Sequence, residues 1–112
     1  MVDDGRVDEL AELFTVDGGF FFGALTAVGR DQVRSWFERN QPAELRGRHL
    51  TTNVVIDVKG DRAGAVSDFA FLAFDDGRLV PRLAGRYEDE LHRVDGRWLI
   101  HRREAIPLRA PG

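Results

Sequence analysis

The second half of the chain carries three long strand-like runs, and these constrain the fold more than any other feature. The runs cover residues 54–58, 63–74 and 83–94, and Gly-containing turns join them. A further run follows Asp95-Gly96, a pair that favours a tight hairpin turn because both residues tolerate positive φ. Consecutive strands joined in this way pair antiparallel and form a meander. A sheet of this extent needs a layer of other elements to cover its apolar face.

The first half of the chain is predicted to supply that layer as two short helices. Apolar residues recur at helical spacing over residues 7–14 and again over 30–37. Residues 15–19 are predicted to break the first helix, and the aromatic run 20–22 either has both faces covered or lines a cavity. Residues 107–112 are predicted to form a coil tail. The chain is therefore predicted to have a short helical front and a strand-rich back.

Length and composition narrow the class of protein further. A chain of 112 residues predicts one domain over residues 1–112, large enough to hold a core without disulfides, and cysteine is absent. The 16 basic and 19 acidic residues are interspersed and give a net charge of −3, which argues against nucleic acid as the main partner. No apolar run reaches the length of a membrane span, and the acidic N-terminus lacks the features of a signal peptide. We therefore expect a cytoplasmic protein without a membrane partner.

Several segments in fixed order carry a resemblance to a known family. They are DDGRVDELAELFTVDGGFFF, GRDQVRSWF, RHLTTNVVIDVKGDRAGAVSDF and GRYEDELHRVDGRWLIHRRE. Together they resemble the SnoaL-like branch of the nuclear transport factor 2-like superfamily, in particular its scytalone-dehydratase-like members. The resemblance implies a cone-shaped, cystatin-like α+β roll in which a bent antiparallel sheet wraps around short helices and an apolar pocket. It also implies a homodimer formed through the outer sheet face, for which Val54, Ile56 and Leu72 are the expected contact residues.

The chain departs from that family at its start. Family members usually begin with a long helix that crosses the sheet, and this chain begins about where that helix should end. We therefore expect a shortened first helix. Either the start codon has been placed too late, or the domain forms a more open cone and a partner chain covers the gap.

The resemblance also implies catalytic residues. His49 resembles the pocket histidine of the dehydratase-like members, and a histidine suits proton transfer because its ordinary pKa lies close to neutral pH. Asp3 resembles the aspartate that pairs with that histidine or with a water. Tyr87 is placed on a strand face that the resemblance points into the cone, where its phenol can donate to a carbonyl or enolate oxygen. The alternatives are a histidine and a tyrosine that only pack against neighbours.

Other residues are expected to bind substrate or to shape the pocket. Asn53 follows His49 by one strand repeat on the same expected face and either binds a substrate oxygen or bonds to the backbone of a bulge. Gly85 stands where the dehydratases carry a pocket serine, and Ala73 stands near their second histidine, so a dehydratase of the same mechanism is not expected. The aromatic residues are first of all core and secondly the lining for a flat apolar ligand; they are Phe20, Phe22, Trp36, Phe69 and Phe71.

Metal and cofactor chemistry are not expected. The histidines at positions 49, 92 and 101 match no helical metal-binding spacing, and no phosphate-binding loop is present. The resemblance therefore implies a cofactor-independent lyase or isomerase acting on a small hydrophobic molecule, cyclic or polyketide-like. His49 would be the general base, Tyr87 and Asn53 would hold the developing oxyanion, and Asp3 would orient the histidine. The alternative is a noncatalytic domain that binds a small apolar ligand or dimerises.

Overall fold

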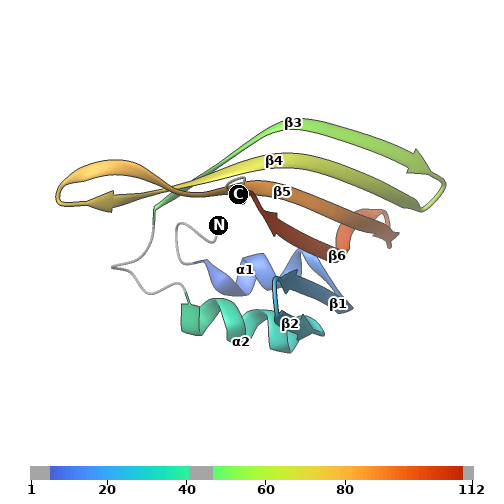
Figure 1. Ribbon diagram of the computed structural model, residues 1–112. Coiled ribbons are helices and arrows are strands. Elements are labelled where there is room, and N and C mark those ends of the chain that lie inside the picture. Colours follow the sequence, from blue (N-terminus) through green and yellow to red (C-terminus); the bar gives the residue numbers. More distant parts are fainter. Residues whose placement is uncertain (1–5, 41–46, 110–112) are drawn as a thin grey trace.

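The computed structural model describes residues 6–40 and 47–109. Within these ranges the chain forms two helices and a curved sheet of six strands, with both helices against one side of the sheet (Figure 1). The elements in chain order are α1 Val7–Glu12, β1 Phe14–Phe22, β2 Leu25–Val28, α2 Arg30–Asn40, β3 Arg48–Lys59, β4 Arg62–Asp75, β5 Arg78–Val94 and β6 Arg97–Pro107. The predicted α+β class with a bent sheet is confirmed.

The strand order in the sheet is β2-β1-β6-β5-β4-β3. The run from β3 to β6 is the predicted antiparallel meander, and its turns contain positive φ where the sequence places glycine. At the last hairpin, Asp95 and Gly96 have φ of 51° and 77°, as a primed turn requires. One pair departs from the antiparallel expectation, since β1 runs parallel to β6.

Two local predictions missed strand residues. The first helix does end before residue 15, but residues 15–19 lie within β1, which pairs with β6 at Phe14 and again from Gly19 onwards, with a register shift between them. Pro107 belongs to β6 rather than to a coil tail, because it lies opposite Gly85 in the sheet. In both cases a neighbouring strand supplies backbone hydrogen bonds that local sequence cannot reveal. Residues 110–112 lie outside the described residues.

The core lies between the helices and the sheet and is largely aromatic. Phe20 contacts Trp36 and Phe37 with ring centroids 5.3 and 5.2 Å apart, and Trp36 meets Phe37 edge-on at 4.8 Å. Val33 is fully buried beside them, so the apolar stripe of α2 is the stripe that the sequence predicted. Burial of each large apolar side chain contributes roughly 1.5–3 kcal/mol, which fixes α2 on the sheet.

The helices are also held by polar contacts. Arg30 donates from Nη2 and Nε to the carbonyl oxygen of Phe14, at 2.6 and 3.1 Å, and so ties the start of α2 to the start of β1. Arg34 pairs with Asp8 of α1 at 3.1 Å. In the described residues no helix is long and apolar enough to cross a membrane.

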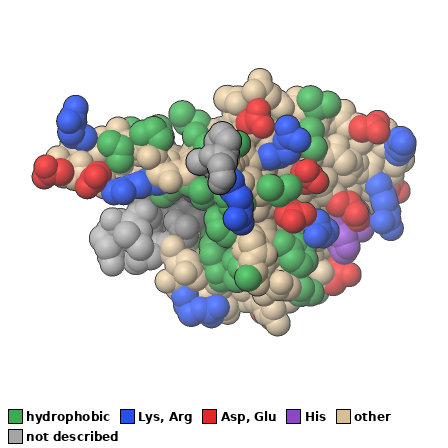
Figure 2. All heavy atoms as spheres, viewed as in Figure 1, with side chains coloured by type: hydrophobic (Ala, Val, Ile, Leu, Met, Phe, Trp, Pro, Cys, Tyr) green, Lys and Arg blue, Asp and Glu red, His purple; other side chains and the backbone are tan. Residues whose placement is uncertain are grey.

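The long strands extend beyond the helical layer. The β4–β5 hairpin forms an arm on which hydrophobic and charged side chains are interspersed (Figure 2). On this arm Phe74 is 68% exposed and Leu79 is 49% exposed. The helices therefore cover only part of the sheet.

Candidate functional site

A cavity of about 520 Å³ lies where the helices face the sheet. Its wall is mostly apolar and aromatic and comes from both helices and from strands β1, β3, β4, β5 and β6. Four polar side chains interrupt that wall, namely Asn40, His49, Tyr87 and Arg103. A site of this kind can enclose a small apolar molecule and hold one polar group of it in a fixed orientation.

His49 reaches the cavity from the start of β3. It lies opposite Phe71 of β4 in the antiparallel register, and residues paired in this way share a face of the sheet. The two rings are 4.6 Å apart between centroids, with 36° between their planes. Phe71 therefore supports one face of the imidazole, and the side chain of His49 is only partly exposed.

Tyr87 and Arg103 form the second polar part of the wall. The ring of Tyr87 stacks on Phe69 at 4.3 Å, and the guanidinium of Arg103 lies 4.1 Å from the centre of the same ring. A cation above an aromatic face is attracted by the electron density of the ring. The tyrosine is thus held between an apolar neighbour and a positive charge.

Asp89 fixes the guanidinium in that position. Arg103 donates from Nε and Nη2 to the two carboxylate oxygens of Asp89, at 2.8 and 2.9 Å, and the Asp89 side chain is 7% exposed. Burial by itself lowers the pKa of Arg103, but the hydrogen bonds and the charge of Asp89 outweigh it and raise that pKa above its ordinary value. The cavity therefore contains a permanent, geometrically fixed cation.

A family model and several solved structures match this arrangement of elements. The model of the SnoaL-like domain matches residues 1–104. The chain belongs to the SnoaL-like domain family. Its fold is that of nuclear transport factor 2-like proteins, because a protein with a cystatin-like fold from Novosphingobium aromaticivorans superposes with a TM-score of 0.88 at 23% identity, over 98% of this chain and 74% of that one.

Two further structures are similar over almost the whole of this SnoaL-like chain. Rv3472 of Mycobacterium tuberculosis, a protein of unknown function, has a TM-score of 0.92 and 29% identity over 97% of this chain, which spans 64% of that protein. A candidate scytalone dehydratase of Novosphingobium aromaticivorans has a TM-score of 0.83 and 28% identity, over 96% of this chain and 74% of that one. No curated protein sequence matches the chain.

The structure brings most of the predicted site residues of this SnoaL-like domain to one place. His49 and Tyr87 line the same cavity, and the five predicted aromatic residues line it with them. These are Phe20, Phe22, Trp36, Phe69 and Phe71. Asp3 lies outside the described residues.

Asn53 does not join His49, and the shared face predicted for the two residues was wrong. A bulge places Asn53 and Val54 opposite the single residue Ser67, because Thr52 pairs with Asp68 while Val55 pairs with Val66. Asn53 has a φ of 54° and donates from Nδ2 to the Asp68 carboxylate at 2.9 Å, on the exposed side of the strand. The simple alternation of side chains between the two faces of a strand does not hold here, because one extra residue moves every later side chain of β3 to the opposite face.

Gly85 lies beside the cavity rather than in its described lining. A Cβ atom at this position would lie 2.3 Å from the carbonyl oxygen of Ile106 and 3.0 Å from Cε1 of Phe69. The absence of a side chain therefore lets β5 and β6 approach closely. It also leaves room for the Phe69 ring that stacks on Tyr87.

Arg103 is the functional candidate that the sequence analysis did not identify. Arg103 is adjacent to Arg102 in the sequence, yet the sheet places the two residues on opposite faces, since Arg103 pairs with Asp89 and Arg102 with Glu90. A usable signal was present, because strand alternation places Asp89 on the same face as Tyr87, and a buried carboxylate requires a cation or several donors.

Groups able to bind a metal ion gather elsewhere. Among the described residues, Glu90, His92 and His101 bring their ligand atoms within 4.8 Å of one another, outside the cavity.

Proposed function

We propose that the cavity binds a small hydrophobic molecule with a carbonyl or phenolic oxygen, and that His49 moves a proton on it in a cofactor-independent lyase or isomerase reaction. The observation that carries this proposal is that His49, Tyr87 and Arg103 line one largely aromatic cavity. Its volume of about 520 Å³ suits a cyclic or short polyketide-like compound. The candidate scytalone dehydratase among the similar structures supports lyase chemistry on a ligand of this class.

Each polar group has a distinct role in this reaction. His49 accepts a proton from a carbon next to the substrate carbonyl, and negative charge then develops on the carbonyl oxygen. The protonated imidazole returns the proton to another carbon of the substrate in an isomerisation, or to the departing oxygen when a carbon–oxygen bond breaks in an elimination. Tyr87 donates a hydrogen bond to that oxygen, while Arg103 supplies a fixed positive charge. Because Asp89 already orients the guanidinium, little reorganisation is needed when the charge appears.

The position of the cation also restricts the substrate. Arg103 lies over the ring of Tyr87, on strand β6, whereas His49 enters from β3 beside Phe71. A substrate with its oxygen at Tyr87 and its acidic carbon towards His49 spans the aromatic wall between the two groups. Flat rings fit such a wall because they stack on the faces of aromatic side chains.

Thermal stabilisation by ligands tests binding at this cavity. A set of small aromatic and polyketide-like ketones and phenols is screened against the wild type, the His49→Ala variant and, as a matched control, the His92→Ala variant. A ligand at 100 times its Kd stabilises the folded state by about 2.7 kcal/mol. Stabilisation that is lost in His49→Ala and kept in His92→Ala places the ligand in the cavity. Equal stabilisation of all three proteins contradicts the proposed site.

Proton exchange separates catalysis from passive binding. Each ligand found in the screen is incubated with the protein in deuterated water, and NMR follows the hydrogens next to its carbonyl. We expect deuterium incorporation with the wild type, a decrease of at least about 100-fold with His49→Ala, and a smaller decrease with Tyr87→Phe. Binding without exchange or turnover in the wild type supports the noncatalytic alternative.

We also propose that a second copy of the chain covers the outer face of the sheet. Apolar side chains stand exposed on that face; Leu50 is 52%, Val55 63%, Val66 39% and Ile106 38% exposed. The bulge at Asn53 brings Val55 onto this face in place of the expected Ile56, which pairs with Ala65 on the cavity side. Charged side chains lie between these apolar ones on the same face, since Val66 pairs with Glu88 and Ile106 with Arg86. Apolar contacts among polar groups are typical of the interfaces between protein chains.

A further inference from the structure

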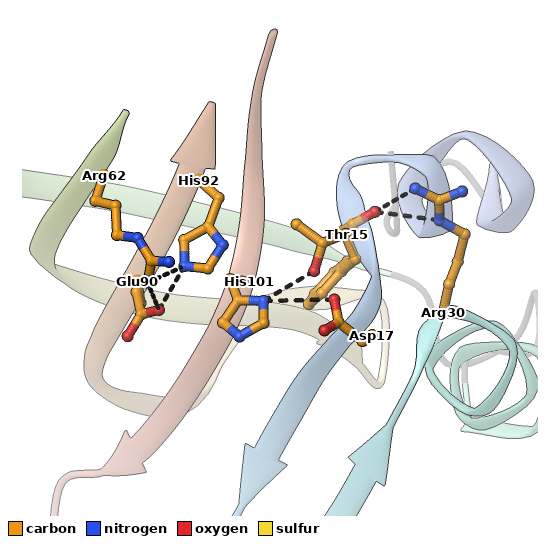
Figure 3. A network of polar contacts seen from close by, with 8 residues as sticks. Thr15, Asp17, Arg30, Arg62, Glu90, His92 and His101 are labelled. Atoms are coloured by element: carbon orange, nitrogen blue, oxygen red, sulfur yellow. Dashed lines mark hydrogen bonds and ion pairs between the residues drawn. The ribbon is translucent and has the colours of Figure 1, made fainter. Parts of the chain in front are cut away.

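A second group of functional side chains lies on the β5–β6 hairpin, away from the cavity. Glu90 and His92 are two residues apart on β5 and therefore point to the same face of the strand. His101 comes from β6, where the register shifts: Glu90 pairs with Arg102 and Leu91 with Ile100, so that His101 is the extra residue of a bulge. The bulge turns its ring towards His92 (Figure 3).

The three side chains are close enough to share one ion. The imidazoles of His92 and His101 stack with centroids 4.0 Å apart and 13° between their planes. Nε2 of His92 lies 2.6 Å from Oε2 of Glu90. One ligand atom from each residue falls within 4.8 Å of the other two. In tetrahedral coordination such atoms are about 3.3 Å apart, and each imidazole directs its nitrogen lone pair at the ion in the plane of the ring, so at least one of the two stacked rings must rotate when an ion binds.

Strand β1 holds His101 in place from the other side. Nδ1 of His101 lies 3.0 Å from Oγ1 of Thr15, which is buried, and 3.7 Å from Oδ1 of Asp17 (Figure 3). Histidines that bind metal ions usually engage one ring nitrogen in this way with an oxygen, which orients the ring and leaves the lone pair of the other nitrogen for the metal. Because the fold already orders the His101 side chain, little further conformational entropy is lost there when an ion binds.

We propose that Glu90, His92 and His101 form a binding site for a divalent transition-metal ion such as Zn²⁺, with one imidazole nitrogen from each histidine and a carboxylate oxygen as ligands. Two nitrogen donors favour Zn²⁺, Ni²⁺ or Cu²⁺ over Mg²⁺ and Ca²⁺, which prefer oxygen. Water completes the coordination. The ion links β5 to β6 beside β1, and this role is independent of the chemistry proposed for the cavity.

The charged groups around the site influence its affinity for a metal ion. The hydrogen bond with His92 lowers the pKa of Glu90, although desolvation opposes the shift, so the carboxylate is ionised at neutral pH. Arg62 is the competing group, because its Nη1 lies 3.2 Å from Nε2 of His92 and 3.8 Å from Oε2 of Glu90. Its side chain is 70% exposed and can turn into solvent when the ion enters.

Calorimetric titration of protein without a polyhistidine tag tests the site. ZnCl₂ is added to the wild type and to His92→Gln, His101→Gln and Glu90→Gln, with His49→Gln as the matched control and MgCl₂ as the control ion. We expect one Zn²⁺ per chain, an affinity at least about tenfold lower in each variant of the cluster, and an unchanged affinity in His49→Gln. Arg62→Gln should raise the affinity, because it removes the competing cation.

Histidine ring NMR gives a second readout that does not depend on heat of binding. Zn²⁺ should shift the ring nitrogen signals of His92 and His101 and leave those of His49 in place. Circular dichroism confirms that each variant is folded before its titration is compared. The proposal is overturned if Zn²⁺ binds equally well to His92→Gln and His101→Gln, if His49→Gln loses as much affinity as they do, or if millimolar Zn²⁺ shifts no ring signal of His92 or His101.

Discussion

At the scale of single residues, the Asp89–Arg103 pair is the feature on which the cavity most depends. The Asp89 side chain is 7% exposed and therefore almost fully shielded from solvent. The pair also holds a positive charge against the Tyr87 ring. A buried ion pair contributes little net stability compared with apolar residues, but removal of one partner leaves the other charge unpaired. The pair therefore fixes geometry at the cavity wall rather than the overall stability.

Replacement of Asp89 by Asn should destabilise the protein substantially. The Arg103 charge would lose its bidentate partner, and we expect a loss of about 3 kcal/mol in the free energy of unfolding, measured by urea denaturation. Glu104→Gln is the control, because its pair with Arg102 is exposed and should contribute less than about 1 kcal/mol. Equal losses in the two variants would show that the Asp89 pair is not effectively buried.

Glu90 should contribute to the acid sensitivity of the fold. Its pKa in the folded state is lowered by the hydrogen bond with His92, so it lies below the unfolded value of about 4.3. The resulting stability is present above the unfolded pKa and is lost as the pH falls through the folded pKa. We expect Glu90→Gln to flatten the loss of stability below about pH 4.3, by less than about 1 kcal/mol because the side chain is partly exposed. Urea denaturation of both proteins at pH 3 to 6 measures the difference.

At the scale of elements, close approach between β5 and β6 positions the aromatic wall. Gly85 lies opposite Pro107, and a Cβ there would be 2.3 Å from the Ile106 carbonyl oxygen. A backbone atom cannot move aside as a flexible side chain would. The separation of these strands therefore determines where Phe69 and Tyr87 stack.

Gly85→Ala should separate the strands at that point. We expect a loss of about 1–3 kcal/mol in the free energy of unfolding, together with a change in the near-ultraviolet circular dichroism of the aromatic cluster. Gly64→Ala is the matched control on β4, where an added Cβ meets nothing within 4 Å, and it should change stability by no more than about 0.5 kcal/mol. A Gly85→Ala protein as stable as Gly64→Ala would contradict this account of the strand contact.

At the scale of the whole molecule, the helices cover one face of the sheet and leave the other face exposed. Exposed apolar side chains on that outer face, with the arm of the β4–β5 hairpin, are consistent with a homodimer in which two sheets pack together. A charge placed among the exposed apolar side chains of that face would lose its water in the dimer. Dimerisation can therefore be tested separately from activity.

Val55→Lys and Val66→Lys should shift the proposed dimer towards the monomer by at least about tenfold in the dissociation constant, because each replaces an exposed apolar contact by an ammonium group that must lose its water in the interface. Light scattering coupled to size-exclusion chromatography measures the mass across a dilution series. Val16→Lys, on β1 and 73% exposed, is the control and should leave the mass unchanged. A wild type that stays monomeric at high protein concentration would contradict the proposal.

The sequence by itself determined the meander, the two short helices, the family and the aromatic character of the core. The family follows from the order of several motifs along the chain. The elements and the core follow from local periodicity and from turn residues such as Asp95-Gly96, whose effects extend over only a few neighbours. Tertiary structure alone decided the parallel pairing of β1 with β6 and the register shifts of the sheet, among them the bulges at Asn53 and at His101. A bulge depends on the register of two strands far apart in the chain, yet it decides which face every later side chain occupies. For that reason the aromatic wall was predictable, whereas the loss of Asn53 from the cavity and the pairing of His92 with His101 were not. The position of Arg103 could be anticipated only indirectly, because the inward-facing carboxylate of Asp89 requires a cation.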